Sequence, residues 1–499
     1  MPEDRSDPDE WERYLSAPVA NRLVIVALEV LAGMTGTVAR LARWGAAKPL
    51  LIADGRGVGP VPAPDTADVL VLDRVVFDSL TDQVRAQMHP ESRFGPSVAA
   101  AVETYDPDGR AVWWVSPVGP NTPLLGRAVL GGRPPPQALL EDKLLLDDLL
   151  AAIDGPKSPS AIAPASYDAL MSATERVMRD AGNDQVVWAG DARDGTNGGG
   201  DYVRWIRTTD QARDAAAFFG ARCDKVRVSA FLEGLPCSIH GLCLPDGVVV
   251  LRPVELATLR DPVAGRFTQA GMGTSWDPHP DDTREIRRVA RAMGELLQRS
   301  KGYRGAFGLD GVITVDGFRV NEMNPRFSGG ITALSRTAPA ACLDLVQLNA
   351  LIGRDIAKPA AEVEERTLAL LDDNRFVDVR GLSPRRLLDE TVEVAVRVGE
   401  ARLERADLSE LDVESVSPDQ VEGELADVVG SVSGGPSPLG VFVRLTVADG
   451  VVRVGDRAAP YGVLLLDFAD RMWETGFGRL LMPPDVRAVQ ASGRGIADG

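Results

Sequence analysis

The sequence predicts a mixed fold in three parts: an α/β unit at the N-terminal side, a larger α+β unit in the middle and a small α+β unit at the C-terminal side. Apolar runs alternate with helical patterns up to residue 136, which is typical of a parallel sheet covered by helices. Beyond that point strands follow one another through short turns, which favours antiparallel pairing. The chain has 499 residues, 44% hydrophobic and 25% charged, which suits a globular protein of about three domains.

The N-terminal unit, residues 1–136, begins with a βαβ pattern. The stretch RLVIVALEVLAGMTGTVARLARWGAAKPLLIADG reads as strand, glycine-containing loop, helix and strand, and the runs ADVLVL and AVWWVSP continue the alternation. Gly33 and Gly36 are present, but the GxGxxG arrangement is absent. We therefore expect a sheet domain that binds no dinucleotide. The stretch LGGRPPPQ breaks the pattern and predicts a boundary near Pro136.

The middle unit, residues 137–358, is predicted to start with one helix over ALLEDKLLLDDLLAAI. A second helix, SYDALMSATERVMRDAG, precedes the strand DQVVWAG and a glycine-rich loop, DARDGTNGGGD. Strands follow from Lys225 onward, with a turn at Pro245–Gly247. The stretch DTREIRRVARAMGELLQRS carries an apolar stripe at helical spacing. This order of elements predicts two layers of sheet and helix.

A hairpin near the end of the middle unit brings two acids together. The stretches FGLDGVIT and FRVNEMN are rich in strand formers, and Val315–Gly317 is predicted as a three-residue loop because Gly317 suits a left-handed backbone. This register sets Asp310 opposite Glu322 and on the same face as Asn324, whereas a two-residue turn would move Asp310 to the other face. Opposed carboxylates repel, and oxygen ligands suit a hard cation. The hairpin therefore predicts a Mg²⁺ site.

The C-terminal unit, residues 359–485, differs from the middle unit in its sequence pattern. A charged stretch, VEERTLALLDDNRFVDVRGLSPRRLLDE, is followed by VGSVSGGPSPLGVFVRLTVADGVVRVG, which suggests strands around loops. This pattern predicts a small α+β appendage, which could serve a substrate or a homodimer. The tail, residues 486–499, is predicted to be disordered.

Composition excludes several classes of function. The formal net charge is −18, and no basic face of the kind that binds nucleic acid is present. The most apolar early run, LVIVALEVLAGM, is too short to cross a bilayer, and the first residues lack the apolar core of a signal peptide. The four cysteines form no CxxC pair and the three histidines form no zinc pattern. We therefore expect a cytoplasmic protein with reduced cysteines.

The stretch GYRGAFGLDGVITVDGFRVNEMNPRFSGG resembles the C-terminal signature of the ATP-grasp superfamily. Members of that superfamily join a carboxylate to an amine through an acyl phosphate. The resemblance implies a Rossmann-like pre-ATP-grasp domain, a two-lobed ATP-grasp domain and an added C-terminal domain. It also implies that Asp310, Glu322 and Asn324 hold Mg²⁺, or Mn²⁺ in its place, on the phosphates of ATP. Arg326 would then lie at the phosphate that is transferred.

The same resemblance assigns the nucleotide contacts. Lys143 is similar to the lysine that opens the first lobe, and the glycine-rich loop is similar to the flap over the phosphates. The hinge VSAFLEG would hold adenine, and Glu233 would contact the ribose. The ATP-binding residues it implies are Lys143, Gly195, Gly198, Gly199, Gly200, Val228, Ser229, Phe231, Leu232 and Glu233. The sequence departs from the pattern near Trp188, where many members have a lysine.

The stretch CSIHGLCLPDGVVVLRPVELATLR, taken with the signature, is similar to pheganomycin-type peptide ligases. Those enzymes attach an unusual amino acid, through its carboxylate, to the amine of a peptide. Arg252 and Arg326 are the candidate catalytic cations, because guanidinium groups bind phosphate and carboxylate with two hydrogen bonds. The candidate substrate contacts are Glu255, Arg260, Ser328 and Gly329. Ion pairs of Arg252 or Arg260 with Glu255 are the structural alternative.

Three functions remain open at this point. The first is an ATP-dependent ligase of an amino-acid-like carboxylate and a peptide or amino-acid amine. The second is another ATP-grasp reaction, either ligation of two small metabolites or phosphotransfer. The third is a binding module without catalysis. The missing lysine near Trp188 favours the third, and the intact set of Asp310, Glu322, Asn324 and Arg326 disfavours it.

Overall fold

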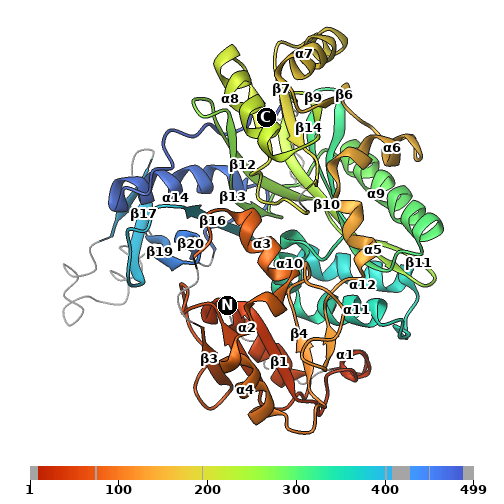
Figure 1. Cartoon of the computed structure of the whole chain (residues 1–499), viewed down its shortest axis with the longest axis vertical. Coiled ribbons are helices and arrows are strands. Elements are labelled where there is room, and N and C mark those ends of the chain that lie inside the picture. Colours follow the sequence, from red (N-terminus) through yellow and green to blue (C-terminus); the bar gives the residue numbers. More distant parts are fainter. Residues whose placement is uncertain are drawn as a thin grey trace, which may run out of the picture.

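The computed structural model describes residues 9–72, 76–193, 195–398, 402–406, 428–448 and 450–486. Its strands form three sheets: one of five strands, one of four and one of eleven. Figure 1 shows the five-stranded sheet at the bottom, the four-stranded sheet at the top, and the large sheet running between them towards the C-terminal elements in blue. The predicted fold class, a parallel α/β unit followed by antiparallel α+β units, is confirmed.

The N-terminal unit is a parallel sheet, as its alternating pattern predicts. Its strands in spatial order are β3 (Asp68–Val71), β2 (Leu50–Ala53), β1 (Val24–Glu29), β4 (Val112–Trp114) and β5 (Ala128–Leu130). Its helices are α1 (Glu10–Ser16), α2 (Leu31–Arg43), α3 (Leu80–Met88) and α4 (Pro96–Tyr105). Strand β1 is buried over most of its length because helices cover a parallel sheet on both faces. The predicted βαβ start corresponds to β1, α2 and β2.

The first lobe of the middle unit is a four-stranded antiparallel sheet. Its strands in spatial order are β6 (Ser160–Pro164), β9 (Lys225–Ala230), β7 (Val186–Gly190) and β8 (Val203–Ile206). Helices α7 (Tyr167–Ala181) and α8 (Thr209–Arg222) pack on one face, where Trp188 and Phe219 are fully buried.

The large sheet joins the second lobe to the C-terminal unit. Its strands are β10 (Leu235–Leu244), β11 (Gly247–Val250), β12 (Val254–Asp261), β13 (Arg266–Gly273), β14 (Gly305–Thr314), β15 (Gly317–Asn324), β16 (Val377–Ser383), β17 (Val392–Val398), β18 (Leu403–Arg405), β19 (Val428–Ser437) and β20 (Gly440–Val447). Strand β13 pairs with β16, so the C-terminal strands continue the sheet of the second lobe. Helices α9 (Pro280–Lys301) and α14 (Ala458–Trp473) pack on this sheet.

Of the two predicted domain boundaries, the first lies between two separate sheets, whereas the large sheet continues across the second. Pro136 lies in α5 (Pro135–Ala138), between the parallel sheet and the first lobe. Pro359 is the N-cap of α12 (Ala360–Asp373), a helix that packs on β11 of the second lobe. The strands do not separate there, since the sheet runs on through the pairing of β13 with β16. The predicted disordered tail lies, except for its first residue, outside the described residues.

The helix predicted over ALLEDKLLLDDLLAAI is wrong as a single helix. The chain forms α5, two 3-10 turns, η2 (Leu139–Glu141) and η3 (Lys143–Leu145), and then α6 (Leu146–Ala151). The break is at Asp142, whose backbone is extended and whose carboxylate accepts from Leu144 N–H. Asp favours such a cap over a helix interior. The break lets Glu141 contact Arg326 and lets Lys143 contact Glu322. Glu322 belongs to the hairpin of β14 and β15, called the metal hairpin below, and Arg326 follows it.

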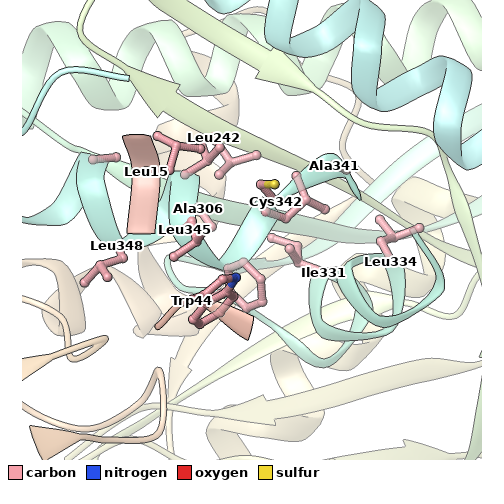
Figure 2. Close-up of a cluster of buried hydrophobic side chains, with 14 of the residues drawn as sticks. Leu15, Trp44, Leu242, Ala306, Ile331, Leu334, Ala341, Cys342, Leu345 and Leu348 are labelled. Atoms are coloured by element: carbon pink, nitrogen blue, oxygen red, sulfur yellow. The ribbon is translucent and has the colours of Figure 1, made fainter. Parts of the chain in front are cut away.

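The main hydrophobic core lies between the N-terminal unit and the second lobe. Helices α10 (Gly329–Thr337) and α11 (Leu343–Leu351) contribute to this core, and Figure 2 shows the side chains of Leu15 and Trp44 packed beside Leu242 and Leu345. Asn349 donates a hydrogen bond to the carbonyl oxygen of Leu15 (2.8 Å). The N-terminal unit is therefore held on the second lobe by one shared core. No helix among the described residues is long and apolar enough to cross a membrane.

Candidate active site

The turn of the metal hairpin is one residue shorter than the sequence predicts. Thr314 pairs with Gly317, so the turn holds only Val315 and Asp316. The Thr314 hydroxyl donates to the Gly317 carbonyl oxygen (2.9 Å) and accepts from Asp316 N–H (3.2 Å). These bonds close the tight turn, and Gly317 supplies the positive φ of 94°. The predicted three-residue loop is therefore wrong.

A β-bulge restores the pairing of the two acids. The pairing on β15 skips Asn321, so Asp310 lies opposite Glu322 as the sequence predicts. Gly311 makes room beside the bulge, because a Cβ at this position would lie 2.4 Å from the Arg319 carbonyl oxygen. The short turn shifts the register by one residue and the bulge shifts it back. The predicted opposition of Asp310 and Glu322 is confirmed.

The predicted metal ligands converge. The side-chain amide of Asn324 donates to Asp310 Oδ2 at 2.9 Å. Burial, and then the charge of Glu322, raise the pKa of Asp310 to about 6, although hydrogen bonds from Ser238 and Asn324 act in the opposite direction. A carboxyl group with a raised pKa carries a charge that its surroundings compensate poorly. A divalent cation would supply that compensation.

The donor set fits a cation shared with phosphate groups. Among the described residues no three or more His, Cys, Asp or Glu side chains form a cluster that could hold a metal by themselves. Mg²⁺ is usually held by one or two carboxylates together with substrate phosphates and water. Asp310, Glu322 and the amide oxygen of Asn324 are the residues that would hold it here.

Lys143, at the start of η3 just before the first lobe, contacts the same site. Its Nζ lies 3.0 Å from Glu322 Oε1 and donates to Asn197 Oδ1 at 2.8 Å. Asn197 belongs to the glycine-rich loop. One ammonium group therefore connects the metal hairpin to the loop that the resemblance places over the phosphates.

Arg326 is fixed by an acid that sequence reasoning missed. Its Nε donates to Glu141 Oε1 at 2.5 Å and its Nη2 to Asn324 Oδ1 at 3.1 Å. Arg133 donates to the other oxygen of Glu141 at 2.7 Å. Burial acts to raise the pKa of Glu141, but the charges and hydrogen bonds of these two arginines outweigh it, and the pKa lies below its ordinary value. The closeness of Glu141 to Lys143 in the sequence is the one signal that could have identified it.

Arg133 is a second missed residue near the site. Its side chain is buried, yet its Nε and Nη1 have no hydrogen-bond partner among the described parts of the chain. Buried donors are normally satisfied. Arg133 and Arg326 thus form a pair of guanidinium groups that share one carboxylate.

The glycine-rich loop is docked on α3 of the N-terminal unit. Thr81 N–H donates to Asp201 Oδ2 (2.9 Å), and the Thr81 hydroxyl exchanges hydrogen bonds with Gly198 N–H (3.2 Å) and its carbonyl oxygen (3.3 Å). Arg85 donates to the carbonyl oxygen of Thr196 at 3.1 Å. The described glycines predicted as the flap therefore lie between the first lobe and α3.

Gly199 shows why this loop is rich in glycine. Its φ is +63°, and a Cβ here would lie 2.3 Å from Leu80 Cδ2. Gly195 and Gly200 also have positive φ values, whereas Asp194 lies outside the described residues. Glycine is needed both for the backbone conformation and for the close approach of α3.

Most backbone N–H and C=O groups of the predicted adenine hinge already form hydrogen bonds within the protein. Val228 and Ser229 lie inside β9, which pairs with β6 on one side and β7 on the other. Phe231 N–H donates to the carbonyl oxygen of Gln185 (3.0 Å), and the Phe231 carbonyl oxygen accepts from Asn183 (2.7 Å). Backbone hydrogen bonds from Val228 through Phe231 to adenine are therefore not supported, and of the predicted hinge residues only Leu232 lies beyond these bonds.

Arg260 lies at the hinge rather than with Glu255. Its guanidinium group forms an ion pair with Glu233 at 2.7 Å and lies 4.9 Å from the ring centroid of Phe231. Phe231 is stacked on Trp205 at 4.9 Å. Arg260 and Glu233 thus form a charged border beside an aromatic stack, which differs from the predicted substrate contact for Arg260.

Arg252 and Glu255 lie in separate structural networks. The Arg252 side chain pairs with Asp277 and Asp372. Glu255 is fully buried and accepts from Ala458 N–H at 2.6 Å and Arg457 Nε at 3.1 Å, so it caps the N-terminus of α14. The predicted alternative, an ion pair of Arg252 or Arg260 with Glu255, is wrong, because each of these residues has another partner. A substrate contact for Glu255 is not supported.

Arg227 is a buried cation that the sequence predictions left out. Alternate residues of β9 pack with α7 and α8, so Arg227 faces the other side of the sheet. It donates to both oxygens of Asp147 on α6, at 2.8 and 3.2 Å. Trp188, near which a lysine is missing, instead packs in the core and donates to Thr174 (2.9 Å). The alternation in KVRVSA was the signal for Arg227.

His240 connects the metal hairpin to the start of α10. Its ring nitrogens hydrogen-bond with Ser238 (3.2 Å) and Ser328 (3.4 Å). Gly330 packs so closely that a Cβ on it would lie 2.0 Å from the His240 Nε2. Burial lowers the pKa of His240 to about 3. Of the predicted substrate residues, Ser328 is thus positioned by this neutral imidazole, whereas the neighbours of Gly329 are Met272 and Arg380.

We expect His240→Asn to change how stability depends on pH. The folded-state pKa of His240 lies below the unfolded value of about 6.5. Its contribution to stability is therefore complete above pH 6.5 and is lost as the pH falls, because the unfolded imidazole takes up a proton. Between pH 7 and pH 4.5 the wild-type protein should lose about 2–3 kcal/mol more unfolding free energy than the variant. Urea unfolding at both pH values measures this, with His89→Asn, at an exposed histidine, as the control. Parallel losses in wild type and His240→Asn would contradict it.

Comparisons with known proteins found similar chains among solved structures only. No protein-family model matches the sequence, and no curated protein matches it. The chain is similar to phosphoribosylamine–glycine ligase from Thermotoga maritima, with 14% identity over 89% of this chain and 96% of that one and a TM-score of 0.48. It is similar to biotin carboxylase from Campylobacter jejuni, with 11% identity over 86% and 88% and a TM-score of 0.48. D-alanine–D-alanine ligase from Coxiella burnetii matches at 16% identity over 69% and 97%, with a TM-score of 0.40.

Proposed function

We propose that this chain is an ATP-dependent ligase that joins a carboxylate to an amine through an acyl phosphate and releases ADP and phosphate. The single observation that carries the proposal is the convergence at one point of Asp310, Glu322 and Asn324 with Lys143 and Arg326. Asp310, Glu322, Asn324 and Arg326 match the ATP-grasp signature, and Lys143 resembles the lysine that opens the first lobe. Asp310 lies on β14, Glu322 and Asn324 lie on β15, and Lys143 lies in η3.

The residues have separate tasks in this proposal. Asp310, Glu322 and Asn324 would hold Mg²⁺, with Mn²⁺ as a substitute, and the bound cation would neutralise phosphate charge. Lys143 and the glycine-rich loop would contact the phosphate chain, since backbone N–H groups and an ammonium group bind anions. Arg326 would stabilise the charge that develops as the substrate carboxylate attacks the γ-phosphorus. Glu141 and Asn324 hold Arg326 in the orientation that this needs.

The amide-forming step requires little from the protein beyond position. The amine nitrogen attacks the carbonyl carbon of the acyl phosphate and the carbon–nitrogen bond forms. The carbon–oxygen bond to phosphate breaks, and the departing phosphate takes up the proton that the nitrogen loses. A neutral amine supplies its own electron pair, so no dedicated base is required. His240 is buried with a strongly lowered pKa and acts as a positioning residue instead.

The finer proposal is that the carboxylate belongs to an unusual amino acid and the amine to a peptide, as in natural-product biosynthesis. The resemblance to pheganomycin-type ligases supports it. The C-terminal unit adds further support, because it extends the sheet of the second lobe and so adds surface for a larger substrate. We further propose that the protein acts in the cytoplasm. A homodimer remains a proposal for its assembly.

The reaction is tested by incubating the protein with ATP, Mg²⁺ and pooled amino acids and short peptides, followed by separation of nucleotides and products. We expect ADP and a new amide, both dependent on the acid and the amine. AMP as the main nucleotide product would overturn the acyl-phosphate route. ADP formed with small metabolites but never with peptides would keep the reaction and remove the peptide assignment. Absence of any substrate-dependent turnover would favour a binding module.

A further inference from the structure

A large cavity lies where the N-terminal unit, the second lobe and the C-terminal unit meet. Its volume is about 1160 Å³. The wall is formed by β1 and α2, by α10, and by β16 and β20, which Figure 1 shows converging near the centre of the molecule. The charged residues on this wall are Glu29, Arg40, Arg336, Asp344, Asp373, Arg375, Asp378, Arg380 and Arg444. We refer to it below as the three-unit cavity.

One carboxylate in this cavity faces three guanidinium groups. Arg336 Nη2 donates to Asp378 Oδ2 at 3.1 Å, and Arg444 Nη2 lies 3.3 Å from Asp378 Oδ1. Burial acts to raise the pKa of Asp378, but the charges of Arg380, Arg444 and Arg336 lower it below its ordinary value. Asp378 can neutralise only one of the three positive charges. The excess is notable in a protein whose formal net charge is −18.

The N-terminal unit contributes one more positively charged side chain, Arg40, to the cavity wall. Arg40 on α2 lies 3.5 Å from Asp344, so this pair contributes no free negative charge. Burial, followed by the charges of Arg380, Arg444 and Arg40, lowers the pKa of Arg336 against the opposing effect of Asp378. Burial raises the pKa of Glu29 on the same wall, although the charges of Arg40 and Arg336 act in the opposite direction. The cavity therefore has a positive centre that an anionic ligand group would neutralise.

The three-unit cavity is next to the candidate active site. Phe327, the residue after Arg326, lines it together with Thr332 of α10. A Cβ added to Gly329 would lie 3.8 Å from Arg380 Nη2, so the arginine cluster adjoins the end of the signature segment. A ligand anchored on the cluster could thus extend one end towards Arg326.

We propose that the three-unit cavity binds the amine substrate as a short peptide, with the peptide's C-terminal carboxylate on Arg336, Arg380 and Arg444 and its amino end directed towards Arg326. Guanidinium groups bind carboxylates with paired hydrogen bonds. The volume exceeds the range of roughly 300–1,000 Å³ that accommodates most small ligands, which fits a peptide better than a single metabolite. This assignment rests on the proposed ligase function.

Binding tests the assignment without requiring turnover. The protein is dialysed to equilibrium against a mixture of randomised tripeptides and, separately, against the same mixture with amidated C-termini, and retained peptides are measured by mass spectrometry. We expect at least tenfold more retention of the free carboxylates than of the amides. The double change Arg380→Gln and Arg444→Gln should remove this preference. The exposed arginines Arg213 and Arg284, changed together to Gln, are the matched control and should retain it.

Other binding results would overturn the assignment. Equal retention of acids and amides, or no retention, excludes a carboxylate anchor. Displacement of the peptides by millimolar inorganic phosphate at equal strength would indicate a phosphate site instead. Arg444→Gln alone, at an exposed side chain, provides a variant that should fold normally, as checked by thermal unfolding. Should tripeptides bind as expected while no ADP forms, the cavity assignment stands and the ligase function fails.

Discussion

Replacing Glu322 with Gln is expected to lower ADP formation by about 100- to 1,000-fold while the protein stays folded. The change removes one of two opposed carboxylates, and with it half of the charge that would hold the divalent cation on the phosphates. Glu322 contacts Lys143 at 3.0 Å and contributes no packing to the core. Loss of its charge also relieves Asp310, whose pKa Glu322 raises. The unfolding temperature should therefore not fall.

Steady-state ADP release over a range of Mg²⁺ concentrations measures this effect. The apparent Mg²⁺ requirement should rise together with the loss of rate. Glu295→Gln on α9 makes the same chemical change at an exposed ion pair and should leave the rate unchanged. Wild-type turnover by Glu322→Gln at low Mg²⁺ would rule out the metal assignment.

Arg326→Lys is expected to lower kcat/KM for ATP by about 100-fold or more even though the positive charge remains. Arg326 contacts Glu141 through Nε and Asn324 through Nη2, and its remaining N–H groups can reach a phosphate. A lysine ammonium group is a single point and cannot make these contacts together. In the proposed mechanism the planar guanidinium group, rather than its charge alone, would fix the direction of the hydrogen bonds to the transferred phosphate.

The control is Arg319→Lys on β15, the strand that precedes Arg326, where the arginine donates to the backbone of Phe318 (2.9 Å). It should behave as wild type in both kinetics and thermal unfolding. Arg326→Lys should unfold near the wild-type temperature, since Glu141 keeps its contact with Arg133 at 2.7 Å. A variant with unchanged kcat/KM would mean that Arg326 has a structural role only.

The sequence predicts features that depend on neighbours along the chain. Alternation along strands placed Asp310, Glu322 and Asn324 on one face, and apolar runs identified β1, α2 and β2. The turn of the hairpin was mispredicted because the side chain of Thr314 closes a tighter turn than glycine alone requires. The helix over Glu141 and Lys143 was mispredicted because a local cap at Asp142 outweighs strong helix formers.

Contacts between distant parts of the chain were beyond sequence reasoning. Arg252 pairs with Asp372, and Glu255 accepts a hydrogen bond from the N-terminus of α14. The partner lies more than 100 residues away in each case. Nothing near these residues indicates such partners, because ion pairs depend on how sheets and helices pack. The docking of the glycine-rich loop on Thr81 belongs to the same class.

The extra residue in β15 has a consequence for how related chains diverge. Asn321 takes up the offset that the short turn introduces, so the distance in sequence between Asp310 and Glu322 does not determine which turn joins them. A relative could gain a residue in the turn and lose the bulge, and its acids would still face each other across the strands. Hairpins of equal length can therefore differ in shape, and hairpins of unequal turn length can present the same ligands. Evolution can vary this tip while the pair of carboxylates stays in register.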